Sequence, residues 1–299
     1  MLDLKGCGTA LVTPFTADGK LDESALRRFV DFQIENGIDF LVPCGTTGES
    51  ATLTEAEHLR VIEITIDQAR KRVPVIGGAG GNNTAHIIDL AKKVEALGVD
   101  GILSVSPYYN KPTQEGLYQH FKAVAASVKV PIVVYNVPGR TAVNILPDTV
   151  IRLSAIDNII AVKEASGSMD QITEICVRVP DGFKVFSGDD SMTVPIMSVG
   201  GVGIISVASN EIPAEMTELA GLCLKGDYAA AQKLNKKLFP IMKINFIETS
   251  PGPVKAAVAM MGLITESYRL PIVPVQPETR AKLRAVLESL NLIPAGAAV

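Results

Sequence analysis

The sequence predicts an α/β fold, a (β/α)8 TIM barrel followed by a small C-terminal helical domain. Short apolar segments alternate eight times with helix-length amphipathic segments, as expected for a parallel barrel. The apolar segments are nearly continuous, which is typical of strands covered on both faces. An open doubly wound sheet is the alternative, but the chain has no GxGxxG or GxxxxGK(S/T) motif to support it.

The eight expected strands are rich in β-branched and aliphatic residues and are bounded by turn-forming residues. In chain order they span residues 7–13, 39–44, 74–79, 101–106, 131–136, 159–163, 183–187 and 203–208.

Helices are expected between these strands, and two of them begin with a capping-box pattern. Thr54 precedes Glu57 by three residues at the start of a helix over 54–71. Ser168 precedes Gln171 in the same way, directly after the sixth strand.

Three helical stretches remain after the last barrel helix, near residue 226. They cover residues 227–247, 254–263 and 278–290. We therefore expect a catalytic barrel over residues 1–226 and a helical domain over residues 227–299.

Composition excludes several classes of function. With 47 % hydrophobic residues, 20 % charged residues and a net charge of −4, the chain is expected to fold and to offer no nucleic-acid-binding face. It shows neither the basic and apolar regions of a signal peptide nor an apolar run of about 18 residues, so we expect a cytoplasmic protein without a membrane partner. The three histidines and four cysteines are scattered, which predicts no metal site, no disulfide framework and no bound cofactor.

Lys163 is the most informative residue because it ends a short apolar strand. Burial disfavours the charged form of a lysine and lowers its pKa, so that the neutral amine becomes available as a nucleophile. Taken alone, a strand-end lysine that reaches solvent or pairs with Glu164 is the simpler interpretation.

Other polar residues follow neighbouring strands, at the barrel end where active sites form. The turn over 45–50 offers exposed backbone N–H groups and the hydroxyls of Thr46 and Thr47 to a small anion. Tyr135 can move protons, and Arg140 can bind a carboxylate through two hydrogen bonds. Each residue also has a simpler interpretation, as an ordinary turn, a core tyrosine or a solvated arginine.

Together, a lysine, a tyrosine, an anion-binding turn and an arginine around one barrel mouth suit imine chemistry on a 2-oxo acid. The lysine would condense with the ketone, the turn would hold the carboxylate and the tyrosine would transfer protons. The scarcity of histidines argues against a metal-dependent aldol reaction.

Long motifs of the chain resemble the dihydrodipicolinate synthase family of class I pyruvate-dependent aldolases. The matching segments are 45–49 (GTTGE), 108–110 (YYN), 135–141 (YNVPGRT), 163–165 (KEA), 187–190 (SGDD) and 253–255 (PVK). They stand in the family's order and spacing over essentially the whole chain.

The resemblance implies a role for each matching residue. Lys163 forms the imine with pyruvate, Tyr135 transfers protons, and Thr46 links Tyr135 to Tyr109, which reaches in from a neighbouring subunit. The implied substrate-binding positions are Thr47 for the pyruvate carboxylate and, through their backbone, Gly188 and Ile205.

The superfamily also contains N-acetylneuraminate and sugar-acid lyases, which share the lysine and the tyrosine. Arg140 resembles the synthase branch, where it receives the carboxylate of L-aspartate 4-semialdehyde. The expected reaction is therefore condensation of this aldehyde with pyruvate, on the path to diaminopimelate and lysine. The alternatives are another pyruvate-dependent Schiff-base aldolase and, in a different class, a non-catalytic barrel that binds an oxo acid.

The resemblance further implies a homo-oligomer, a tetramer built from tight dimers, with an effector site for lysine at the dimer interface. The matching effector positions are Ser50, Ala51, Glu55, His58, Gly80, Asn82, His86 and Tyr108. Glu55 stands where the inhibited bacterial relatives have a histidine, and His86 stands where they have a glutamate. Because a histidine replaces the carboxylate expected near the ligand's α-ammonium, we expect weak or no inhibition by L-lysine.

Overall fold

The structure is a computed structural model that describes residues 2–296. Eight parallel strands form its centre, and each strand pairs with its neighbours in the order β2-β1-β8-β7-β6-β5-β4-β3. The strands are β1 Gly6–Ala10, β2 Phe40–Val42, β3 Ile76–Gly78, β4 Gly101–Val105, β5 Ile132–Asn136, β6 Ile159–Glu164, β7 Lys184–Ser187 and β8 Gly203–Ser206. The bridge Leu41↔Val75 joins the two ends of this order, so the sheet curves into a barrel.

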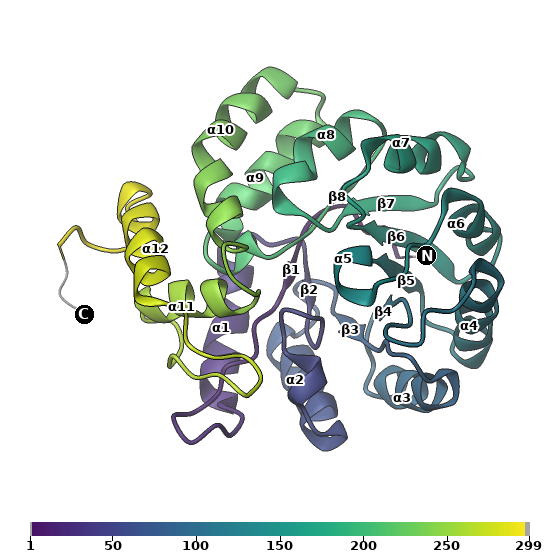
Figure 1. Ribbon diagram of the computed structural model, residues 1–299, viewed down its shortest axis with the longest axis horizontal. Coiled ribbons are helices and arrows are strands. Elements are labelled where there is room, and N and C mark those ends of the chain that lie inside the picture. The colour runs from purple at the N-terminus through teal and green to yellow at the C-terminus, as the bar shows by residue number, and fades with distance from the viewer. Residues whose placement is uncertain (1, 297–299) are drawn as a thin grey trace.

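Helices surround the strands, as the alternating pattern of the sequence requires (Figure 1). They are α1 Glu23–Glu35, α2 Glu55–Ala69, α3 Thr84–Ala96, α4 Gln114–Ser127, α6 Pro147–Ser154, α7 Met169–Arg178, α8 Thr193–Ser198 and α9 Pro213–Leu224. A short helix, α5 Pro138–Thr141, follows β5 at the barrel mouth. The predicted (β/α)8 barrel is therefore confirmed.

The three C-terminal helices lie at one side of the barrel (Figure 1). They are α10 Tyr228–Ile244, α11 Gly252–Met260 and α12 Pro277–Ser289, and α10 packs against α8 and α9. The division into two domains at residue 226 stays a prediction, and residues 1 and 297–299 of the predicted domains lie outside the described residues.

One of the two predicted capping boxes forms. Thr54 accepts a hydrogen bond from the backbone of Glu57, and the Glu57 carboxylate accepts one from the Thr54 N–H. At the start of α7, Ser168 caps the backbone of Gln171, but the prediction of a full box is wrong because the Gln171 side chain donates to Glu164 instead. A buried carboxylate competes better for this amide than an exposed backbone group does.

Alternation along β6 decides which side chains enter the barrel. Ala161 belongs to the cluster inside the barrel, whereas Val162 packs between the strands and the outer helices. Successive side chains of a strand point to opposite faces, so Lys163 points inward and Glu164 outward. β5 is in register, with Tyr135 beside Lys163 and Asn136 beside Glu164.

Candidate active site

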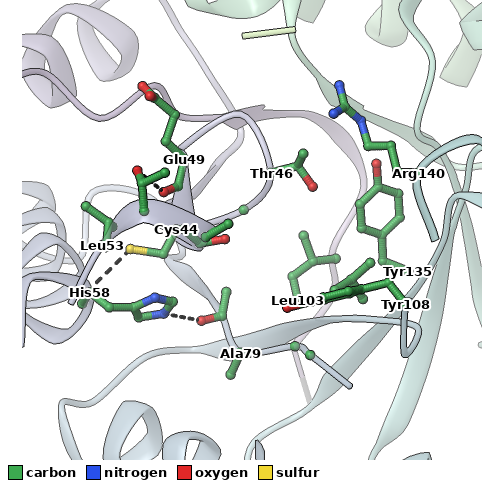
Figure 2. A pocket seen from close by; sticks show the side chains of 18 of the residues that line it. Cys44, Thr46, Glu49, Leu53, His58, Ala79, Leu103, Tyr108, Tyr135 and Arg140 are labelled. Carbon is green, nitrogen blue, oxygen red and sulfur yellow. Dashed lines mark hydrogen bonds between the residues drawn. The ribbon is translucent and has the colours of Figure 1, made fainter. Parts of the chain in front are cut away.

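The residues predicted to carry chemistry meet at the carboxyl ends of β2, β5 and β6. A cavity of about 580 Å³ opens between them and is lined by Gly45, Thr46, Tyr135 and Arg140. Figure 2 shows Thr46, Tyr135 and Arg140 around one end of this cavity, with His58 at the other.

Lys163 is almost completely buried beneath this mouth, with 4 % of its surface exposed. Its ammonium lies 4.2 Å from the centre of the Tyr135 ring. Burial lowers the pKa of Lys163 to about 7; the negative charge of Asp190 opposes this change, and the nearby positive charge of Arg140 adds to it. Near neutral pH the amine is therefore present in large part as the free nucleophile.

Tyr135 places a phenol beside this amine. Its side chain is buried, which raises the pKa of the phenol to about 12; the positive charge of Arg140 and, to a smaller extent, the hydrogen bond of Thr46 partly offset the increase. A phenol that remains protonated can donate to a leaving hydroxide and then be reprotonated through Thr46.

The turn that carries Thr46 and Thr47 has an unusual backbone. Cys44 and Glu49, on either side of it, both adopt the left-handed conformation, with φ of 57° and 54°. A Cβ at Gly48 would lie 3.0 Å from the Leu11 carbonyl oxygen, a tight contact that favours glycine between the turn and the segment after β1. Non-glycine residues hold this conformation only where their surroundings enforce it, as at functional sites.

A buried ion pair fixes one end of this turn. The Lys255 ammonium, on α11, donates to the Glu49 carboxylate at 2.5 Å, and the exposure of the two side chains is 0 % and 2 %. Lys255 also lies over the Phe15 ring, 4.3 Å from its centre. The sequence shows Lys255 in a family motif, but this contact joins residues 206 positions apart and is visible only in the structure.

Arg140 lies on α5, at the rim of the cavity. Its guanidinium donates to the Ser250 carbonyl at 3.1 Å, and among the described residues no carboxylate forms a salt bridge with it. Its remaining donors are available to an anionic substrate.

The structure places Gly188 beside Lys163 and Ile205 inside the barrel. Gly188 follows β7, and a Cβ there would lie 3.1 Å from the Lys163 Cε, so glycine leaves room for the lysine chain. A second cavity, of about 420 Å³, is lined by Gly188, Tyr135 and Arg140. Ile205, on β8, is buried in the cluster inside the barrel.

Asp190 is a buried residue of this region to which the sequence analysis gave no role. Its carboxylate accepts hydrogen bonds from the Ser206 hydroxyl and from the Val207 and Ala208 backbone. Burial raises its pKa to about 6, and its charge acts on Lys163. The second carboxylate of the SGDD motif was the available signal.

Tyr109 is not brought to the site within one chain. Its side chain is 89 % exposed, and the residue adopts a left-handed φ of 71° in the loop after β4. The implied contact across a subunit boundary stays a prediction.

The predicted effector residues all line the larger cavity, which they share with Tyr135 and Arg140. The cavity is lined by Ser50, Ala51, Glu55, His58, Gly80, Asn82, His86 and Tyr108. Glu55 is already paired there, because Lys93 donates to its carboxylate at 2.6 Å. Burial lowers the pKa of His58, whose Nε2 contacts the Gly78 carbonyl at 2.7 Å.

Within residues 2–296, no cluster of three or more His, Cys, Asp or Glu side chains is arranged to hold a metal ion. In the same part of the chain, no helix combines the length and the apolar character that crossing a membrane requires.

Comparison with known proteins places the chain in one group. The family model described as "Dihydrodipicolinate synthetase family" matches residues 3–290. The 4-hydroxy-tetrahydrodipicolinate synthase of Koribacter versatilis is 57 % identical over 293 residues, which cover 98 % of each chain.

Solved structures agree with this result. Dihydrodipicolinate synthase from Aquifex aeolicus superposes with a TM-score of 0.95 at 46 % identity, covering 97 % of this chain and 99 % of that one. The chloride-inhibited dihydrodipicolinate synthase from Acinetobacter baumannii, complexed with pyruvate, gives a TM-score of 0.96 at 42 % identity, covering 97 % and 100 %.

Proposed function

The chain belongs to the dihydrodipicolinate synthetase family and has 4-hydroxy-tetrahydrodipicolinate synthase activity, and we propose that it acts through an imine between Lys163 and pyruvate. The second substrate is L-aspartate 4-semialdehyde. The reaction is a step of diaminopimelate and lysine biosynthesis. The burial of Lys163 beside Tyr135 is the observation that carries this proposal.

Imine formation uses the lysine together with Tyr135 and the two threonines of the turn. The neutral amine of Lys163 attacks the ketone carbon of pyruvate, and Tyr135 donates a proton to the hydroxyl that leaves as water. The turn holds the pyruvate carboxylate through Thr47, while Thr46 connects the phenol to the proton path.

Condensation then joins the two substrates. The enamine form of bound pyruvate attacks the aldehyde carbon, and Arg140 holds the carboxylate of the aldehyde substrate. The α-amino group of the condensed product attacks the imine carbon, which closes the ring and releases Lys163 as the free amine.

Borohydride trapping tests the imine. Treatment with pyruvate and borohydride should inactivate the enzyme and add one reduced pyruvyl group to the peptide that contains Lys163. Lys163→Arg keeps the charge but lacks the nucleophile, so neither trapping nor turnover should occur. Modification of another lysine would overturn the assignment.

A coupled assay tests the second substrate and the expected absence of a metal. The enzyme should turn over L-aspartate 4-semialdehyde with pyruvate and should not cleave N-acetylneuraminate. Dialysis against a chelator should leave the activity with L-aspartate 4-semialdehyde unchanged. Turnover of N-acetylneuraminate would instead favour the lyase alternative, and a loss of activity restored by a divalent ion would favour a metal-assisted reaction.

The active enzyme is a cytoplasmic homo-oligomer, a tetramer built from tight dimers, in which Tyr109 of one subunit completes the proton path of the next. The exposure of Tyr109 outside its own site supports this arrangement. The four cysteines are all free thiols, which suits a reducing compartment.

A further inference from the structure

Glu164 lies on the outer face of the barrel wall, directly behind the lysine that carries the chemistry. Its side chain is fully buried. The partners that donate to its carboxylate are all uncharged: Asn136 Nδ2 at 3.0 Å, Gln171 Nε2 at 3.0 Å and the Ser166 N–H at 2.8 Å. Burial raises the pKa of this carboxyl, and the hydrogen bonds oppose the increase.

A buried carboxylate without a cationic partner is costly, and its donors must be held in place to compensate. The Asn136 and Gln171 amides also bind Asn144, at 2.8 Å and 2.7 Å. In addition, the Asn136 Oδ1 accepts a hydrogen bond from the Ile145 N–H at 2.9 Å. Glu164 therefore anchors a closed network between β5, β6 and the start of α7.

This network fastens both ends of the segment that carries Arg140. The segment leaves β5 at Asn136 and returns at Asn144, and the two side chains are hydrogen-bonded to each other. Arg140 lies midway between them in the sequence, and among the described residues the only hydrogen bond of its guanidinium is to the Ser250 carbonyl. The position of the guanidinium is thus set mainly by where its backbone segment is held.

We propose that Glu164 is a positioning residue that fixes the Arg140 segment relative to Lys163, and so selects the anionic aldehyde as the second substrate. The pairs Tyr135–Lys163 and Asn136–Glu164 stand side by side in the β5–β6 register. The inner pair performs the reaction, and the outer pair sets the distance from the imine to the cation that receives the aldehyde's carboxylate.

This inference rests on the proposed role of Arg140, and the test separates the two. Glu164→Gln keeps the shape of the side chain but replaces one accepting carboxylate oxygen with an NH2 group. This NH2 group would face the N–H groups that donate to Glu164. We expect kcat/KM for L-aspartate 4-semialdehyde to fall about five- to tenfold, the range for one buried hydrogen bond. The kcat/KM for pyruvate and the rate of borohydride trapping should change less than about twofold, because Lys163 keeps its own surroundings.

A double-mutant cycle distinguishes positioning from general damage. If Glu164 acts through Arg140, adding Glu164→Gln to Arg140→Ala should lower kcat/KM for the aldehyde by less than about twofold further. The proposal would be overturned if the double variant's loss of kcat/KM equalled the product of the losses in the two single variants. It would also be overturned if Glu164→Gln reduced pyruvate trapping as much as it reduced kcat/KM for the aldehyde. Absence of trapping at Lys163 in the unmodified enzyme would instead refute the proposed function.

Asn144→Ala provides a second variant should Glu164→Gln fail to fold. Asn144 is only partly buried, and its loss frees the far end of the Arg140 segment while leaving Glu164 its own donors. It should lower kcat/KM for the aldehyde about two- to fivefold and spare pyruvate trapping. Gln119→Ala, which removes an exposed amide bonded to Glu115, is the matched control and should change neither value. No selective loss in Asn144→Ala would contradict the proposal.

Discussion

At the scale of single residues, the reactivity of Lys163 follows from where β6 ends. The inward position inside an apolar barrel removes water from the amine, and Arg140 discourages a second positive charge nearby. The negative charge of Asp190 limits how far the pKa of Lys163 is lowered. The pKa of about 7 is therefore a balance of named groups that can be altered one at a time.

The rate of imine formation should follow the neutral fraction of Lys163. Because the pKa is lowered to about 7, the amine is mainly protonated at pH 6 and mainly neutral at pH 8. The trapping rate with pyruvate should therefore rise through pH 7 and level off above it. Single-turnover trapping between pH 5.5 and 9.5 measures this, and a rate still rising tenfold per unit at pH 9 would contradict it.

Arg140→Ala should mainly affect the second substrate. Loss of a charge-assisted hydrogen bond costs about 1.5–3 kcal/mol, so kcat/KM for L-aspartate 4-semialdehyde should fall about ten- to a hundredfold. Since Arg140 also lowers the pKa of Lys163, pyruvate trapping should be compared at pH 8.5, where the variant amine is still largely neutral. An equal defect in trapping there would show that Arg140 does not discriminate between the substrates.

At the scale of elements, the turn that we propose as the pyruvate-carboxylate site depends on a helix far away in the sequence. Glu49 occupies a left-handed position that glycine would adopt with less strain. Its buried bond to Lys255 gives a reason for the side chain, because the pair connects the turn to α11.

Lys255→Met should destabilise the enzyme strongly. It leaves the Glu49 charge buried without a partner, and breaking a buried pair in this way costs about 3–5 kcal/mol. The double variant Glu49→Gln/Lys255→Met should recover most of that loss, because no charge then remains. Urea unfolding at one protein concentration measures the free energy of unfolding of the single and double variants. If the losses of Glu49→Gln and Lys255→Met simply added in the double variant, the pairing argument would be wrong.

L-Lysine should inhibit weakly or not at all. Glu55 already binds Lys93 in the predicted effector cavity, so it is not free to receive an ammonium, and His86 supplies no carboxylate. An inhibition curve at saturating pyruvate tests this expectation. Strong partial inhibition at submillimolar lysine would show that Glu55 exchanges partners. In that case, Lys93→Ala should strengthen the inhibition further.

The elements themselves were largely predictable from the sequence, and their long-range contacts were not. The eight apolar segments and the capping residue Thr54 act locally, so pattern and spacing suffice to identify them. The spacing of Ser168 and Gln171 predicts a capping box, but the Gln171 amide donates to Glu164 instead. The sequence does not show that these two side chains face each other. The partnership of Glu49 with Lys255 escaped notice for the same reason.

At the scale of the whole molecule, one residue of the proposed proton path, Tyr109, lies away from the other site residues of its own chain. Thr46, Tyr135 and Arg140 surround one cavity (Figure 2), and Lys163 is buried beside Tyr135, while the Tyr109 side chain is exposed. Motifs located the inward residues because the barrel gathers the carboxyl ends of all its strands. No pattern within one chain reveals the surface that covers an exposed tyrosine.

Activity should therefore depend on a dimer. Sedimentation under assay conditions should show a dimer or a tetramer built from two dimers, the usual closed arrangements. Tyr109→Phe removes only a hydroxyl and should slow turnover while leaving assembly unchanged. A fully active monomer would refute the shared site, and full activity of Tyr109→Phe would refute the role of the hydroxyl.

The register between β5 and β6 also bears on protein engineering. Each catalytic side chain on the inner face has, as its next residue in the chain, a member of the outer network: Asn136 after Tyr135 and Glu164 after Lys163. A designer who transplants this lysine chemistry into another barrel would have to carry over dipeptides rather than single residues. If our proposal holds, a lysine and a tyrosine grafted alone would supply the nucleophile but lack the network that positions the cation for the aldehyde's carboxylate.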